Sequence, residues 1–200
     1  MTITINGNGT VTGVSVGGLP DGIVDTDMLA AGAVTAAKKG AGSILQVVTV
    51  NKTDKVSKTS ISQGSETSAF FTATITPSSS SNKILVIAHA NLGCGAANSV
   101  AMRIQRDGST PSAGTLNGDS DGNRRYVASA GYVHDNGAQT NLHYTFLDSP
   151  STTNATVYSI VGLHGSTSST TITMNGPETD ANETWQHRTT SSITLMEVAV

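Results

Sequence analysis

The run Ile84-Leu-Val-Ile-Ala88 decides the fold, because continuous apolar character over so few residues is typical of a buried central β-strand. Residues 100–105 then place Val, Met and Ile at alternate positions, which is the period of a strand that buries one face. Similar runs extend in both directions along the chain. We expect further strands at residues 44–50, 70–76, 126–131, 142–146, 157–163, 172–174 and 193–198.

Turn-forming dipeptides separate these runs. Short strands with such punctuation are typical of a β-sandwich, and no helical pattern interleaves them as a parallel βαβ architecture would require. The sequence therefore predicts an all-β, jelly-roll-like antiparallel sandwich over residues 43–200. The turn signals are Asp107-Gly108, Asn117-Gly118, Asp121-Gly122, Asn136-Gly137 and Asn175-Gly176.

The composition argues against several classes of protein. Charged residues are only 12% of the chain, and 11 basic against 14 acidic residues give a net charge of −3. This balance is atypical of a disordered chain and of a nucleic-acid-binding protein. No apolar run reaches the roughly 18 residues of a membrane helix, and the start at Met1 lacks the pattern of a signal peptide. The single cysteine, Cys94, excludes an intrachain disulfide and is expected to be a buried free thiol.

Residues 1–42 differ from the rest and are expected to form an N-terminal arm. Ile3 and Ile5 alternate with threonines before the Asn6-Gly-Asn-Gly9 turn, and a second alternating run follows at residues 12–16. An Asn-Gly turn between two alternating runs predicts a short hairpin.

A short helix is predicted over residues 25–40, where Asp25 can cap the first turn and Gly40 can end the last. A short helix and a lone hairpin are each marginally stable. The arm is therefore expected to pack on its own domain, on a sister chain or on a docking partner. Its candidate attachment residues are Ile3, Ile5, Met28 and Leu29.

The β domain contains the segments Ile75-Thr-Pro-Ser-Ser-Ser-Ser-Asn-Lys-Ile-Leu-Val86, Arg103-Ile-Gln-Arg-Asp-Gly108, Phe146-Leu-Asp-Ser-Pro-Ser-Thr-Thr-Asn-Ala-Thr-Val-Tyr158 and Ile193-Thr-Leu-Met-Glu-Val198. These segments resemble the C-terminal domains of bacteriophage tail fibres, notably of phages of cyanobacteria and marine bacteria. The resemblance implies a homotrimer whose arm attaches to the virion and whose β domain touches the host surface. Similar modules also serve as head fibres and decoration proteins, so the position on the particle stays open.

The chain offers no catalytic signature. No Gly-x-Ser-x-Gly elbow occurs, and the neighbouring carboxylates Asp119 and Asp121 lie in a turn rich in Gly, Asn and Asp. Residues 119–123 resemble part of a calcium loop but lack its closing glutamate. Three copies of His143 or His164 could meet on a threefold axis and bind a metal, although exposed strand histidines are the favoured interpretation. We therefore expect no enzyme, no cofactor and no metal.

Candidate receptor-binding residues are aromatic and planar polar side chains in loops, because sugars present both apolar faces and hydroxyl groups. Trp185 is the first candidate, since an exposed tryptophan is a common binding anchor, but its side chain could equally cover the edge of the core. The candidates form three groups: Trp185 with Gln186, His187 and Arg188; Arg124, Arg125 and Tyr126; and Tyr132, His134 and Asp135.

The resulting hypothesis is a trimeric phage tail fibre, assembled in the bacterial cytoplasm and carried on the virion tail. Residues 1–42 would attach it to a tail or baseplate protein, and residues 43–200 would bind a host surface polysaccharide. A capsid decoration or head-fibre protein is the first alternative. A small glycan depolymerase is the second.

Overall fold

The computed structural model describes residues 4–5, 11–12, 33–35, 38–95, 97–112 and 114–200. The chain divides into two compact units, residues 1–39 and residues 40–200. In the first unit, strand β1 (Thr4–Ile5) pairs antiparallel with β2 (Val11–Thr12), as expected for the hairpin. Of the predicted helix, residues 25–32 and 36–37 lie outside the described residues, and residues 33–35 are not helical.

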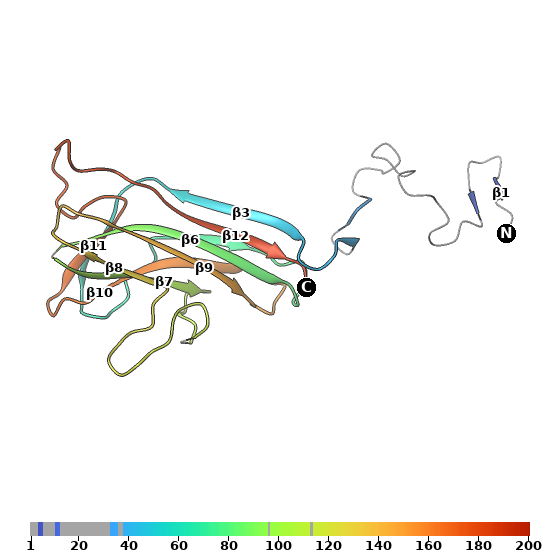
Figure 1. Cartoon of the computed structure of the whole chain (residues 1–200), viewed down its shortest axis with the longest axis horizontal. Coiled ribbons are helices and arrows are strands. Elements are labelled where there is room, and N and C mark those ends of the chain that lie inside the picture. Colours follow the sequence, from blue (N-terminus) through green and yellow to red (C-terminus); the bar gives the residue numbers. More distant parts are fainter. Residues whose placement is uncertain (1–3, 6–10, 13–32, 36–37, 96, 113) are drawn as a thin grey trace. The chain divides into compact units, whose positions relative to one another are not determined.

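The second unit is a sandwich of two antiparallel sheets with a jelly-roll-like fold (Figure 1), as the strand pattern predicts. The larger sheet has six strands in the order β3-β12-β6-β11-β4, and β9 pairs with the other edge of β6. β4 was not predicted, because its apolar residues stand only at its two ends. The strands are β3 (Ile44–Lys52), β4 (Val56–Ile61), β6 (Lys83–Cys94), β9 (Thr140–Asp148), β11 (Thr170–Met174) and β12 (Ser191–Val198).

The smaller sheet has four strands in the order β5-β10-β7-β8. Its β8 begins three residues later than the sequence predicts, so that Tyr126 precedes the strand. β10 is the strand that is buried along both faces, because loops cover the outer side of this sheet. The strands are β5 (Phe71–Ile75), β7 (Asn98–Arg106), β8 (Ser129–Val133) and β10 (Thr156–His164).

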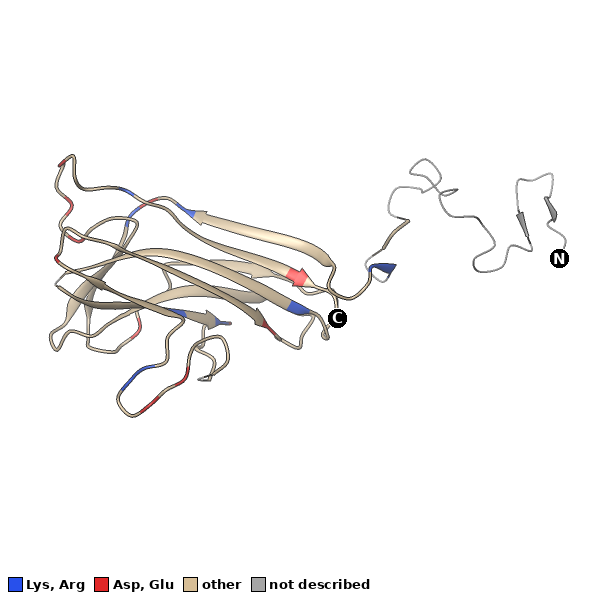
Figure 2. Ribbon diagram, viewed as in Figure 1, with Lys and Arg blue, Asp and Glu red and all other residues tan. Residues whose placement is uncertain are grey.

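The run that decides the fold lies in β6, in the middle of the larger sheet. Ile84, Val86 and Ala88 are buried in the core between the sheets, whereas Ile87 is 37% exposed on the outer face. The expectation of a fully buried run therefore holds for only one face of residues 84–88, since Leu85 is half-buried and Ile87 is exposed on the outer side. Charged side chains lie mainly in loops and at strand ends (Figure 2).

An apolar row crosses the outer face of the larger sheet. Val47, Met196, Leu85 and Leu147 are direct cross-strand partners on β3, β12, β6 and β9. Val47 is 55% exposed and Leu147 is 43% exposed. The neighbouring row consists of Thr49, Thr194, Ile87 and Thr145, so two adjacent rows carry no charge.

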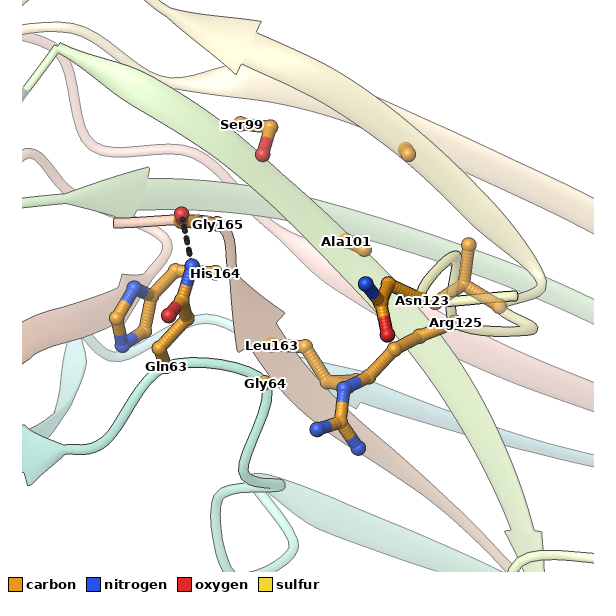
Figure 3. A pocket seen from close by; sticks show the side chains of 11 residues that line it. Gln63, Gly64, Ser99, Ala101, Asn123, Arg125, Leu163, His164 and Gly165 are labelled. Atoms are coloured by element: carbon orange, nitrogen blue, oxygen red, sulfur yellow. Dashed lines mark hydrogen bonds between the residues drawn. The ribbon is translucent and has the colours of Figure 1, made fainter. Parts of the chain in front are cut away.

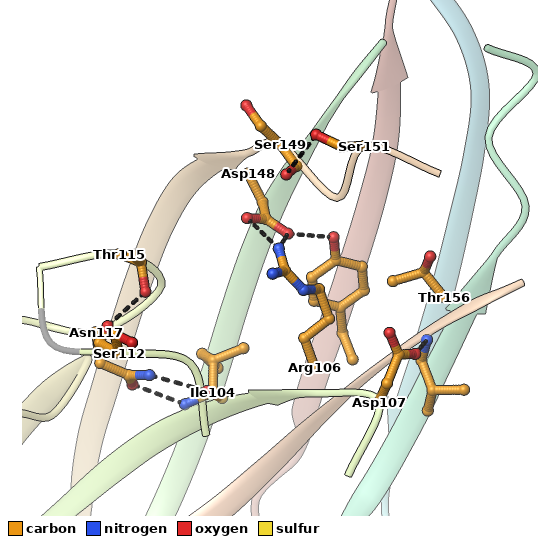
Figure 4. A network of polar contacts seen from close by, with 12 residues as sticks. Ile104, Arg106, Asp107, Ser112, Thr115, Asn117, Asp148, Ser149, Ser151 and Thr156 are labelled. Carbon is orange, nitrogen blue, oxygen red and sulfur yellow. Dashed lines mark hydrogen bonds and ion pairs between the residues drawn. The ribbon is translucent and has the colours of Figure 1, made fainter. Parts of the chain in front are cut away.

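A polar cluster joins the two sheets at one end of the core (Figure 4). Asp148 of β9 accepts hydrogen bonds from Nη1 of Arg106, at 2.8 and 2.7 Å, and from Oη of Tyr158, at 2.6 Å. Burial raises the pKa of the Tyr158 hydroxyl strongly, and the bond to Asp148 adds to this shift. The cluster satisfies a carboxylate that the fold otherwise isolates from water.

Glu197, near the end of β12, connects this strand to the loop before β6. This carboxylate is almost fully buried and accepts hydrogen bonds from Gln46, Ser78 and Asn82 at 2.6 to 2.7 Å. Burial alone would raise its pKa, but the hydrogen bonds outweigh burial and lower the pKa below its ordinary value.

Asn117 anchors the long loop between β7 and β8. Its side chain donates to the Ile104 carbonyl and accepts from the Ile104 amide, both at 2.9 Å, as a neighbouring strand would. The sequence predicts Asn117 in an exposed turn, but it is 1% exposed, and the adjacent Leu116 is fully buried. This anchor fixes where residues 118–128 leave the sheet.

Candidate functional site

An open cavity of about 530 Å³ lies on the outer face of the smaller sheet (Figure 3). Its volume falls within the range of about 300–1,000 Å³ that is typical of small-molecule sites. Three segments enclose it: the end of β4 and the residues after it, the loop before β8, and the end of β10. The lining residues are Gln63, Gly64, Ser99, Ala101, Asn123, Arg125, Val127, Ala130, Leu163, His164 and Gly165.

Small side chains create the hollow. Leu163, Ala101 and Ala130 are direct cross-strand partners on β10, β7 and β8, and two alanines in one row leave room above the sheet. In the next row, Ser99 of the lining pairs with Tyr132, whose side chain is 56% exposed on the same face of the sheet but does not line the cavity. The site therefore has an apolar floor with an aromatic ring beside it.

Arg125 forms one wall and lies against Gly64. A Cβ atom at position 64 would lie 2.7 Å from Cζ of Arg125, so only glycine leaves room for the guanidinium. Gly64 also has a φ of 66°, which favours glycine for a second reason. Its amide donates to the His164 carbonyl at 3.2 Å, which places it beside β10.

Buried Arg103 holds the segment that carries Arg125. Its Nε donates to the Tyr126 carbonyl at 2.7 Å, and its guanidinium lies 4.3 Å from the centre of the Tyr126 ring. Arg103 also forms an ion pair with Glu66, which accepts further hydrogen bonds from Gln105 and Thr110. Tyr126 is thus half-buried and supports the loop. This geometry does not favour the prediction that Tyr126 contacts a receptor.

His164 is a structural member of the cavity wall. Its Nε2 donates to the Ile61 carbonyl at 2.7 Å, and its Nδ1 accepts from the Ser166 amide at 3.1 Å. Both ring nitrogens are thus engaged with the main chain, Nε2 as donor and Nδ1 as acceptor. The interpretation of His164 as an exposed strand histidine is wrong, because the residue is 4% exposed.

A second group of candidate residues lies in the loop between β11 and β12. Trp185 is 61% exposed, and its ring lies against Gly137 of the β8–β9 loop. Hydrogen bonds tie the two loops together, from the Thr179 amide to the Asn136 carbonyl and from Gln139 Nε2 to the His187 carbonyl, both at 2.9 Å.

The two loops bring together residues that are about 50 positions apart in the sequence. His134 meets the Tyr132 ring edge-on, with 5.6 Å between ring centres. Arg188 forms an ion pair with Asp180, and His187 and Arg188 line a shallow hollow of about 260 Å³. Both loops lie at one end of the sandwich (Figure 1).

The remaining predictions fall in different places. Arg124 does not line the cavity; it pairs with Asp121, and both side chains are largely exposed. Ile5 lies in β1, whereas Ile3, Met28 and Leu29 lie outside the described residues. Local patterns do not select Gln63, Ser99, Ala101, Asn123 or Ala130, because strand register and the approach of two loops bring them together.

Metal ligands do not gather in the described part of the chain, where no group of three His, Cys, Asp or Glu side chains could hold an ion. His143 stacks on His89 with 4.7 Å between ring centres, and His89 accepts from Asn141 at 2.9 Å. Cys94 is a buried free thiol, as predicted. Among the described residues no helix is long and apolar enough to cross a membrane.

Comparison with known proteins gives a distant structural likeness. No protein-family model matches the chain. No curated protein sequence matches it either. Among solved structures, a chain from the structure of infectious bursal disease virus, Gx strain, aligns with 77% of this chain at 12% identity and a TM-score of 0.39. The alignment spans 42% of that viral chain.

Proposed function

We propose that the chain is a virion structural protein, a bacteriophage fibre that binds a host-surface glycan in the cavity of the smaller sheet. The observation that carries the proposal is the cavity itself. It combines an apolar alanine floor with the planar polar groups of Gln63, Asn123 and Arg125, and the exposed ring of Tyr132 lies next to Ser99 of its lining. Sugars need this combination, because their rings have apolar faces and their edges carry hydroxyl groups.

The position of the cavity supports a receptor-binding role. The loop between β11 and β12 lies at the end of the sandwich remote from the C-terminus (Figure 1). Gly42 donates to the Ala199 carbonyl at 2.8 Å, so the chain enters the sandwich beside the C-terminus. A head that is tethered at one end and open at the other suits a fibre tip. The resemblance of residues 75–86 and 146–158 to phage tail fibres supports the same proposal.

Attachment and assembly complete the proposal. The arm joins a tail or baseplate protein through Ile3, Ile5, Met28 and Leu29, and three copies form the fibre. The apolar row of Val47, Met196, Leu85 and Leu147 is the contact surface between copies. A face that carries no charge across two rows can meet a second copy of itself without burying an unpaired charge. Three weak sites on one trimer then gain affinity by acting together.

Adsorption inhibition tests the function. Added in excess, the purified full chain is expected to block adsorption of the phage that encodes it, because it occupies the receptor. An assembled protein that fails to block at saturation would overturn the proposal and favour a decoration role on the head. Labelling the protein on intact particles separates tail from head, and release of sugar products from host polysaccharide would instead indicate an enzyme.

A further inference from the structure

We propose that the glycan unit in the cavity is anionic, with its carboxylate or sulfate bound by Arg125. This inference rests on the proposed function and names the class of sugar that the same site takes. The shared chemistry is a negatively charged group on a sugar ring, whether it comes from a uronic acid or from a sulfate ester.

The charge of the cavity supports an anion. Arg125 is the charged member of the lining, which contains no carboxylate, and both ring nitrogens of His164 already bond to the main chain. Among the described residues, no carboxylate oxygen lies within 4.0 Å of the Arg125 guanidinium, whereas Arg103, Arg106, Arg124 and Arg188 each have an acidic partner. A guanidinium without an internal partner is available for bidentate binding of an anion from outside.

The geometry also places the Arg125 side chain at the cavity. Gly64 gives the guanidinium a flat surface of main chain to lie on, where any side chain would displace it. Figure 3 shows Arg125 and Asn123 on one side of the hollow and Gln63 on the other. Gln63 Nε2 donates to the Gly165 carbonyl at 3.0 Å, so Gln63 Oε1 is the atom of this amide that can accept from a ligand hydroxyl. An anion on Arg125 would therefore leave amide groups beside the ring to bind hydroxyls.

The neighbouring arginine provides a matched control. Arg124 has the same charge and the adjacent position, but it pairs with Asp121 and is not part of the cavity. Arg125→Gln and Arg124→Gln change the net charge of the protein equally. A difference between them therefore reports the cavity rather than the overall field of the protein.

The experiment measures binding of the full-length protein to purified host surface polysaccharide in three forms: native, with its carboxylates reduced to alcohols, and desulfated. We expect the wild-type protein to lose about tenfold or more in affinity for one of the treated forms, which identifies the anion. Arg125→Gln should lose as much on the native form, and Arg124→Gln should stay within about twofold of wild type.

Gly64→Ala provides a second variant, which keeps every charge but displaces the guanidinium. It should weaken binding like Arg125→Gln, provided that circular dichroism shows a folded protein. Equal binding of all three polysaccharide forms, or equal effects of the two arginine variants, would overturn the anionic assignment while leaving a glycan-binding protein. Failure of the wild-type protein to bind any form or to block adsorption would overturn the proposed function as well.

Discussion

Tyr158 of the smaller sheet donates a hydrogen bond to Asp148 of the larger sheet, with 2.6 Å between Oη and Oδ2. Tyr158 is fully buried, and Asp148 also binds Arg106 from a neighbouring strand. The contact thus links the two layers through a charged group inside the protein, where a hydrogen bond contributes more than at the surface.

Tyr158→Phe is expected to lower the free energy of unfolding by about 1.5–3 kcal/mol, because it removes a hydrogen bond to a buried carboxylate. Chemical denaturation at neutral pH measures this change. Tyr144→Phe is the control, since the Tyr144 hydroxyl makes no hydrogen bond to a described residue, and it should change stability by less than about 0.5 kcal/mol. Equal effects of the two variants would contradict a role for the Asp148 bond.

Glu197→Gln is expected to cost about 1–3 kcal/mol at neutral pH, because the amide cannot accept from Gln46, Ser78 and Asn82 together. The pKa of Glu197 is lowered below its ordinary value of 4.5, so the carboxylate stabilises the fold above that pH. This contribution is lost as the pH falls through the lowered pKa.

The difference in stability between wild type and Glu197→Gln should therefore shrink as the pH is lowered below about 4.5. Thermal melting across an acid pH series measures it. Glu183→Gln, at an exposed loop position, is the control and should follow the wild-type curve. A constant gap between wild type and Glu197→Gln at every pH would contradict the prediction.

Trp185→Ala is expected to weaken binding to host cells by about tenfold or more, since an exposed tryptophan in a loop is a typical binding anchor. Its melting temperature should hardly change, because the side chain is 61% exposed. Cell-binding assays and calorimetry on the same preparation give both readouts. A large fall in melting temperature would instead show that Trp185 covers the edge of the core.

Val47→Lys combined with Leu147→Lys is expected to convert a trimer into monomers in light-scattering measurements, because the charges would be buried between copies. Thr167→Lys with Ser169→Lys adds the same charge at exposed loop positions and should leave the trimer intact. A monomeric wild type, or a trimer that tolerates both pairs, would contradict the interface. Loss of stability without loss of mass would place another segment of the chain over the row.

Deleting residues 1–39 is expected to leave a folded head that no longer enters virus particles, because residues 40–200 form a compact unit of their own. The melting temperature of the truncated protein tests the first part, and its content in purified particles tests the second. Deleting residues 1–42 should cost about 1 kcal/mol more, since it removes the bond from Gly42 to Ala199. An unfolded 40–200 fragment would show that the arm belongs to the core.

Periodicity in the sequence was enough to predict the sandwich, since nearly every strand shows alternating or continuous apolar residues. It failed for residues 56–61, whose middle is polar, and for Ile87, which an uninterrupted apolar run cannot assign to a face. The cavity was beyond sequence reasoning for a physical reason. Ala101 and Ala130 form its floor only because β7 and β8 pair in one register, which no local pattern encodes.

The same limit applies to predictions of single residues in the candidate site. Arg125, which the sequence analysis selects for its chemistry, lines the cavity, and Tyr132, selected for the same reason, lies opposite Ser99 of its lining. Arg124 and Tyr126 have equally suitable chemistry, but an ion pair engages the first and a supporting contact with Arg103 engages the second. Tertiary partners, which the sequence does not reveal, decide which suitable side chain is free to bind.

The two hydrogen bonds between Asn117 and Ile104 have a consequence for evolution. Residues 118–125 after it are all exposed, and none of them contributes to the core. Mutations, insertions and deletions there can alter the cavity wall that carries Arg125 while the two sheets keep their packing. Selection can thus alter what the cavity binds by changing a short surface segment, and the same segment offers protein engineers a place to graft new specificities onto an unchanged scaffold.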